Sequence, residues 1–157
     1  DNAVWPEITR RKWRTESDYP TTANKETYLA DIKGKADGQF VKTFVSDHWT
    51  LEYDLAYSGL IDEMVSALVI VKYEEVNRAA KTQEITIKID SLPSQEEKAS
   101  YIYSFFHDNS TSKAEFAQQL AAILEKSYAN KREEIIAKLP DYLVQAIDYG
   151  TGGGRGQ

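Results

Sequence analysis

The sequence predicts an α/β protein in which a few short strands are flanked by many helices. Residues 40–45, Phe-Val-Lys-Thr-Phe-Val, are mostly β-branched and aromatic, as is typical of a strand. Residues 84–89 alternate polar and apolar side chains, which indicates a second strand, although a surface insertion would show the same pattern. Most of the chain after residue 50 instead has apolar side chains at helical spacing and two capping signals. Helices therefore outnumber strands.

Bulk properties set limits on the function. The chain has 157 residues, no cysteine and a formal net charge of −6. Without cysteine there is no disulfide framework and no thiolate site. The net charge argues against a protein that binds nucleic acid through bulk positive charge, yet a nuclease that holds Mg²⁺ with carboxylates remains compatible with it. Because the longest apolar run, residues 67–71, is far below the roughly 18 residues of a membrane span, and residues 1–5 are unlike a signal peptide, we expect a soluble cytoplasmic protein.

The elements follow in order along the chain. Residues 1–39 are polar and irregular. After the strand at 40–45, a helix should begin near Thr50. A second should run from Leu60 to about Ala80, because its apolar residues recur at helical spacing. They are Leu60, Ile61, Met64, Val65, Leu68 and Val69.

Capping boxes predict two further helix starts, at Ser94–Glu97 and at Ser112–Glu115. The first helix should bury Ala99, Ile102, Phe105 and Phe106, and the second Phe116, Ala117, Leu120, Ala121 and Leu124. A separate helix is expected over 131–138. Pro140 suits the first position of a last helix, and residues 150–157 form a flexible glycine-rich tail.

The acidic residues after the predicted strand are the first candidates for chemistry. In α/β sheets, ligands bind at the carboxyl ends of strands, and Glu52 and Asp54 follow at the start of a helix. Being two residues apart, they diverge by about 200° on a helix and cannot both face one ion. The alternative is that both acids merely complement the helix dipole.

Three segments resemble the OLD (overcoming lysogenization defect) family of ATP-dependent endonucleases, in the C-terminal part of their Toprim domain. Residues 44–56, which include Trp-Thr-Leu-Glu-Tyr-Asp-Leu-Ala, resemble the segment after a core strand of that domain. Residues 112–117, Ser-Lys-Ala-Glu-Phe-Ala, are similar to the family's Ser-Lys-Gly-Glu-Phe-Ala segment, with Ala114 in place of the commoner glycine. Residues 139–149 resemble its closing helix. The resemblance spans about residues 40–149, of which 72–109 are not diagnostic.

The resemblance implies a partial Toprim-like (Rossmann-like) sheet of few parallel strands with a helix-rich C-terminal half, and it implies roles for particular residues. Glu52 would be a catalytic metal ligand, with Asp54 a weaker candidate and Asp1 another, as the trailing edge of an Asp-x-Asp turn. Lys113 would be the catalytic lysine that binds phosphate. A lysine in the first turn of a helix otherwise opposes the dipole, and a solvated lysine is the alternative.

Further residues are candidates for supporting roles. Ser112 and His48 are candidates for the lining of the site, although a lone histidine is more often structural. Arg10, Arg11 and Arg14 are candidates for contact with the DNA backbone, while a solvated loop is the plainer interpretation of that run.

The predicted function is thus part of a metal-dependent endonuclease that hydrolyses phosphodiester bonds in DNA, in phage or mobile-element defence. The cofactor would be Mg²⁺, or Mn²⁺ or Ca²⁺, and ATP would act only through an upstream ATPase domain, since no Gly-x-x-x-x-Gly-Lys-Ser/Thr loop occurs here. The partners would be DNA, that ATPase domain and a homo-oligomer formed through it. We expect residues 1–149 to be a nuclease fragment, with 1–39 irregular, a core at 40–149 and a helical insertion near 80–110. The alternative is a truncated or decayed, non-catalytic Toprim-like module that acts only in binding.

Overall fold

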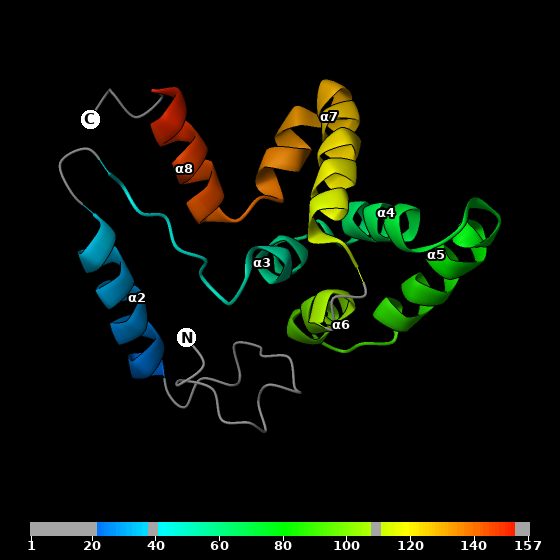
Figure 1. Cartoon of the computed structure of the whole chain (residues 1–157), viewed down its shortest axis with the longest axis horizontal. Coiled ribbons are helices and arrows are strands. Elements are labelled where there is room, and N and C mark those ends of the chain that lie inside the picture. The colour runs from blue at the N-terminus through cyan, green and yellow to red at the C-terminus, as the bar shows by residue number, and fades with distance from the viewer. Residues whose placement is uncertain (1–21, 38–40, 108–110, 153–157) are drawn as a thin grey trace. The chain divides into compact units, whose positions relative to one another are not determined.

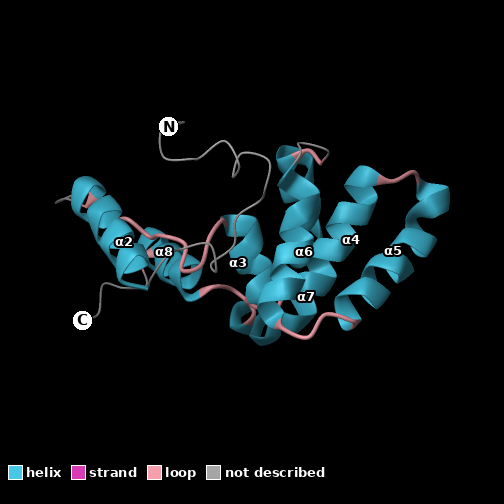
Figure 2. Cartoon of the chain, turned by 90° about the horizontal axis from the view of Figure 1, so that it is seen from below, coloured by secondary structure: helices cyan, strands magenta, loops and turns pink. Residues whose placement is uncertain are grey.

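The computed structural model describes residues 22–37, 41–107 and 111–152, and within these ranges every regular element is a helix. Figure 1 and Figure 2 show helices joined by loops, without a sheet in the described part. The prediction of a Toprim-like parallel sheet is therefore wrong for this part of the chain. Residues 41–46 form no ladder, and residues 84–89 lie inside a helix.

The chain divides into two compact units. One comprises residues 1–50 together with 140–157, and the other comprises Leu51–Leu139. The described helices of the first are α2 (Thr22–Ala36) and α8 (Asp141–Thr151). The second holds α3 (Leu51–Tyr57), α4 (Ile61–Lys72), α5 (Glu75–Asp90), α6 (Gln95–His107) and α7 (Lys113–Ala137).

Helix α8 reaches further than the sequence suggests. It continues through Gly150 and Thr151, where the glycine-rich sequence predicts a flexible tail, and ends at Gly152 in the left-handed conformation, with φ 77°. Pro140 is the N-cap residue of α8, one position before the one expected. The remaining tail, residues 153–157, lies outside the described residues.

Helix α4 is the centre of the second unit, because it packs against α3, α5, α6 and α7. Its apolar residues recur around most of its circumference, so a single covering layer cannot bury them. The buried residues in and just before α4 are Leu60, Met64, Val65, Ala67, Leu68 and Val69. Among the large side chains, those of Leu60, Met64 and Leu68 are fully buried. Tyr53 and Ala56 of α3 add to this core.

The helix expected from Leu60 to Ala80 is two helices, because the backbone turns extended at Tyr73, with φ −126° and ψ 146°. Arg78, at the start of α5, donates hydrogen bonds to the carbonyls of Ile70 and Tyr73, both at 3.2 Å. These bonds satisfy carbonyl groups that the end of α4 leaves without helical partners. The turn is thus stabilised by a side chain that the apolar pattern does not include.

The alternation at residues 84–89 has a helical explanation. Ile85 and Ile89 are four apart, so they share one face of α5, and both are buried. Ile87 points to the opposite face and is 61% exposed. A strand needs a neighbouring strand for its backbone hydrogen bonds, whereas α5 satisfies its backbone internally.

Both capping boxes begin helices as predicted. The backbone N–H of Glu97 donates to Ser94 Oγ at 3.2 Å, and that of Glu115 donates to Ser112 Oγ at 3.3 Å. The helices α6 and α7 meet where the Phe106 and Phe116 rings pack edge to face, with centroids 4.7 Å apart. The helix expected at 131–138 belongs to α7, which is kinked at Lys131.

A turn at Gly59 connects α3 to α4. The N–H of Leu60 donates to the Leu55 carbonyl at 3.1 Å and that of Gly59 to the Ala56 carbonyl at 3.3 Å, which is the Schellman pattern. Gly59 has φ 118°, a conformation that side chains with a Cβ disfavour. Gln95 of α6 completes the end of α3, because its amide donates to the Ala56 and Tyr57 carbonyls, both at 3.0 Å.

We predict that Gly59→Ala lowers the free energy of unfolding by about 1–2 kcal/mol, because alanine must adopt the strained left-handed backbone. The nearest atom to an added Cβ would be Lys138 Cγ at 3.6 Å, an ordinary contact, so the cost comes from the backbone. Urea denaturation followed by circular dichroism measures the change. Gly34→Ala is the control, since Gly34 lies in α2 with nothing within 4 Å of an added Cβ. An unchanged midpoint for Gly59→Ala would contradict the prediction.

Candidate functional site

The two residues singled out by the motifs, Glu52 and Lys113, lie together although they are 61 positions apart in the sequence. Lys113 Nζ is 2.8 Å from Glu52 Oε1. Glu52 is in the first turn of α3 and Lys113 is the first residue of α7. The second unit therefore brings a carboxylate and an ammonium group from two helix starts into one ion pair.

The two partners differ in their contact with solvent. The Glu52 side chain is 14% exposed, whereas the Lys113 side chain is 54% exposed. An ammonium group has three donors, and the carboxylate uses one side of it. The solvent side of Lys113 can thus receive a second anion while Glu52 holds the other side.

The start of α7 places this lysine. Ser112, a candidate for the lining of the site, is the N-cap residue, and its hydroxyl accepts from the Glu115 N–H. Its described role is therefore to begin the helix. The preceding residue, Thr111, is 4% exposed, and its hydroxyl has no hydrogen-bond partner in the described part of the chain.

Asp54 lies in a different environment from Glu52. It is 1% exposed and faces the interior of the second unit, as expected for two residues that diverge on a helix. One of the two acids is thus available at the surface and the other is not. His48 belongs to the first unit, is partly buried and makes contacts of its own.

The described residues do not fit a magnesium site. Among them, no group of three or more His, Asp or Glu side chains is arranged to hold a metal ion. Mg²⁺ favours several oxygen ligands in near-octahedral geometry. Glu52 supplies one carboxylate, already paired with Lys113, and Asp54 is buried. Asp1, Arg10, Arg11 and Arg14 lie outside the described residues.

A second ion pair, which the motifs did not indicate, ties the other end of α7 to the start of α4. Lys138 Nζ is 3.0 Å from Glu63 Oε1 and 3.7 Å from Glu134 Oε1. The hydrogen bond with Glu63 raises the pKa of Lys138 above its ordinary value. Because Glu63 and Lys138 lie 75 positions apart, no local sequence pattern pairs them.

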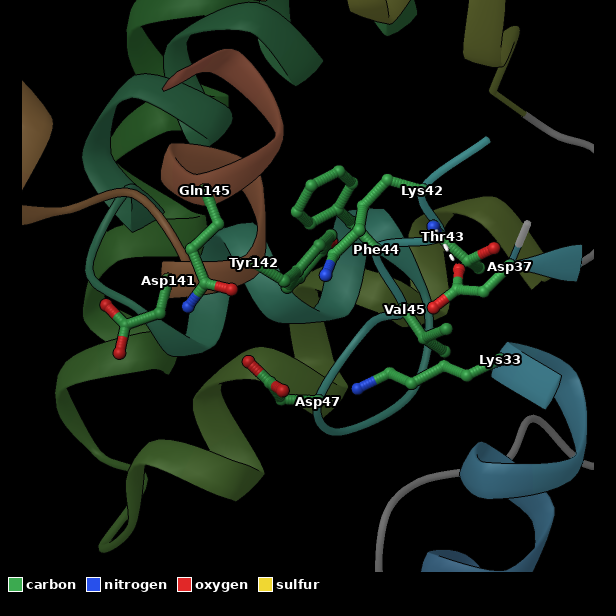
Figure 3. Close-up of a pocket in the computed structure, with 10 residues that line it drawn as sticks. All are labelled: Lys33, Asp37, Lys42, Thr43, Phe44, Val45, Asp47, Asp141, Tyr142 and Gln145. Carbon is green, nitrogen blue, oxygen red and sulfur yellow. Dashed lines mark hydrogen bonds between the residues drawn. The ribbon is translucent and has the colours of Figure 1, made fainter. Parts of the chain in front are cut away.

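The first unit contains a polar pocket of about 370 Å³ (Figure 3). Lys33 and Lys42 extend into it, and Asp47, Asp141 and Gln145 also line it. Asp37 accepts a hydrogen bond from the Thr43 N–H at 2.5 Å, and hydrogen bonding by Thr43 lowers the pKa of this carboxyl. Among the described residues, two lysines and three aspartates line the pocket, and their charge does not favour phosphate. None of the described residues that the sequence singled out for the site is among them.

Comparison with known proteins identifies no relative of this chain. No protein-family model matches the chain, no curated protein matches it, and no solved structure matches its fold. Within the described ranges, every helix is too short or too polar to cross a membrane.

We predict that Lys138→Met lowers the free energy of unfolding by about 1–3 kcal/mol at neutral pH, because it leaves the Glu63 carboxylate largely buried without its cation. Urea denaturation measures the difference. Lys131→Met is the control, since Lys131 is 61% exposed and lies 3.5 Å from a half-exposed Glu134. That variant should change stability by less than about 0.5 kcal/mol.

The stability difference between wild type and Lys138→Met should depend on pH in one direction. Folding raises the pKa of Lys138 above the ordinary value of 10.5. The charged lysine therefore contributes fully to the free energy of unfolding below pH 10.5, and this contribution is lost as the pH rises through the folded-state pKa. Urea denaturation at about pH 7, and again at a pH above the raised pKa of Lys138 in the folded protein, tests this. A difference that grows with pH would contradict the assignment.

Proposed function

We propose that this chain is a helical part of a DNA endonuclease of the kind its motifs resemble, the OLD family, and that Lys113 contacts a phosphate of the scissile strand. The observation that carries the proposal is the meeting of Glu52 and Lys113. A separate sequence motif singles out each of the two residues. A chance pairing of two surface residues from α3 and α7 is the competing explanation.

The chemistry follows from the asymmetry of the pair. Glu52 fixes the Lys113 ammonium from the less exposed side, which reduces the side-chain freedom that must be lost when an anion binds. The exposed side of Lys113 then neutralises a phosphate oxygen as negative charge develops on it during hydrolysis. Glu52 acts here as a positioning residue, and Lys113 is the group that touches the substrate.

The same proposal includes a divalent cation, Mg²⁺ in the first place, that supplies charge stabilisation at the phosphate when bound. Glu52 can be at most one of its ligands, and the others must come from outside the described residues. DNA is the proposed substrate, a linked ATPase domain the proposed partner, and the cytoplasm the proposed compartment.

A non-catalytic helical module is the second candidate. The absence of an acidic cluster from the described residues and the net charge of −6 favour it. In that case the Glu52–Lys113 pair would only fasten α7 to α3. Because Lys113 is half exposed, the pair would contribute about 0–1 kcal/mol to stability.

We predict that Lys113→Ala reduces DNA cleavage by about 10²–10³-fold, as expected for the loss of a group that stabilises transition-state charge. The assay uses the protein as its gene encodes it, with supercoiled plasmid, Mg²⁺ and ATP. Lys131→Ala is the matched control, because it removes an exposed lysine from the same helix. Wild-type cleavage by Lys113→Ala, or no cleavage by the unmodified protein, would overturn the proposal.

The charge-swapped variant, Glu52→Lys with Lys113→Glu, separates catalysis from packing. It preserves an ion pair between α3 and α7, so unfolding measurements should show near-normal stability. Cleavage should remain lost, since an acid would face the phosphate. Recovery of both stability and cleavage would show that the pair acts only in packing.

A further inference from the structure

The chain passes from the first unit into the second and back again only once. The second unit is the continuous segment Leu51–Leu139, whereas the first is made of two segments, residues 1–50 and 140–157. The second unit is thus an insertion in the sequence of the first. As a result, the two segments of the first unit are joined to each other covalently only through the second.

The second unit has a core of its own. Apart from Pro140 at the boundary, every buried apolar side chain among the described residues lies between Tyr53 and Ile135. The half-buried ion pair of Glu63 with Lys138 also joins two residues of this unit. A segment that buries its apolar side chains against one another has the defining property of a domain, since its stability comes from its own contacts.

The two ends of the second unit lie close together. Lys138, next to the last residue of the unit, contacts the turn after α3, because its Cγ lies 3.6 Å from the place of a Cβ on Gly59. Helix α3 connects this turn to Leu51, and its seven residues span about 10 Å. The folded unit therefore holds its ends within roughly 20 Å of each other. The ends of a flexible chain of this length would be about 50 Å apart.

The described helices of the first unit are more open to solvent. Each side chain of α8 is at least partly exposed, and that of Ile147, in the middle of the helix, is 53% exposed. Opening such a helix exposes little additional apolar surface to water, so the free energy that opposes the opening is small. The core around α4 must lose far more contacts before it opens.

We infer that the second unit is an independently stable domain and that its coupling to the first unit acts in one direction. The first unit can open while the second stays folded, because the core around α4 does not change. Unfolding of the second unit instead turns Leu51–Leu139 into a long flexible loop. The entropy of closing this loop then opposes the association of the two segments of the first unit, which opens as well.

The one-way coupling has a consequence for the Glu52–Lys113 pair. Both residues belong to the second unit, so their ion pair persists when the first unit opens. This consequence does not depend on the proposed nuclease function. Failure of the full protein to cleave DNA would leave the order of opening unchanged, and a different order of opening would leave the role of Lys113 unchanged.

Native-state hydrogen exchange of the full chain, followed by mass spectrometry of its peptides, tests the order of opening. In the unmodified protein, the amides of α8 should exchange at least about tenfold faster than those of α4. As urea is added, α8 should lose its protection at a lower concentration than α4, because the first unit opens before the second.

Two variants test the direction of the coupling. Ile147→Pro interrupts α8 and should abolish the protection of its amides, while exchange in α4 changes by less than about twofold. Leu68→Ala removes a fully buried side chain of α4 and should accelerate exchange there by about 100-fold or more. In that variant, α8 should lose its protection no later in the urea series than α4 does.

Three outcomes would overturn the one-way coupling. The first is equal exchange rates of α4 and α8 in the unmodified protein. The second is that Ile147→Pro accelerates exchange in α4 as much as in α8, which would mean a single cooperative unit. The third is that α8 stays protected at urea concentrations where α4 has unfolded. If Leu68→Ala does not fold, the urea series of the unmodified chain still tests the third outcome.

Discussion

The second unit depends on the burial of α4. Its apolar side chains point in too many directions for one neighbour to cover, and Leu60, Met64 and Leu68 are withdrawn from water completely. Full burial of such side chains contributes about 1.5–3 kcal/mol each, more than any surface ion pair of this chain can. The positions of α3, α5, α6 and α7 follow from the need to surround this helix. The ion pairs then fix how α7 lies against α3 and α4 once α4 is buried.

Helix α7 is connected to the α3–α4 segment near both of its ends. Glu52 holds Lys113 at its start, and Glu63 holds Lys138 just after its last turn. The two pairs differ in their surroundings, since Lys113 is half exposed and Lys138 is only 26% exposed. The more buried pair is suited to structure, because its charges have little access to other partners. In the more exposed pair, Lys113 can bind an anion in place of water. The proposed function rests on this pair for that reason.

The sequence was informative wherever a structure is decided over three or four residues. Ser94 and Ser112 begin helices because a hydroxyl reaches an N–H three residues on, and no distant contact is needed for that. The pairing of Glu52 with Lys113 was anticipated only through the motif resemblance, since nothing local joins residues 61 positions apart. Glu63 and Lys138 carry no motif and were missed. Asp54 was separated from Glu52 by helical geometry alone.

By itself, the sequence determined that helices begin after Ser94 and Ser112, and it identified most of the buried residues of α4 and α6. These follow from backbone hydrogen bonds and helical periodicity, which act over short distances. The tertiary structure alone decided that residues 84–89 are helical and that no described segment forms a sheet. A short segment of alternating polar and apolar residues can form either a helix or a strand. Which one forms depends on whether a partner strand or an apolar surface such as that of α4 lies next to it. Here α4 was present, and Ile85 and Ile89 packed against its unit while Ile87 was left at the surface.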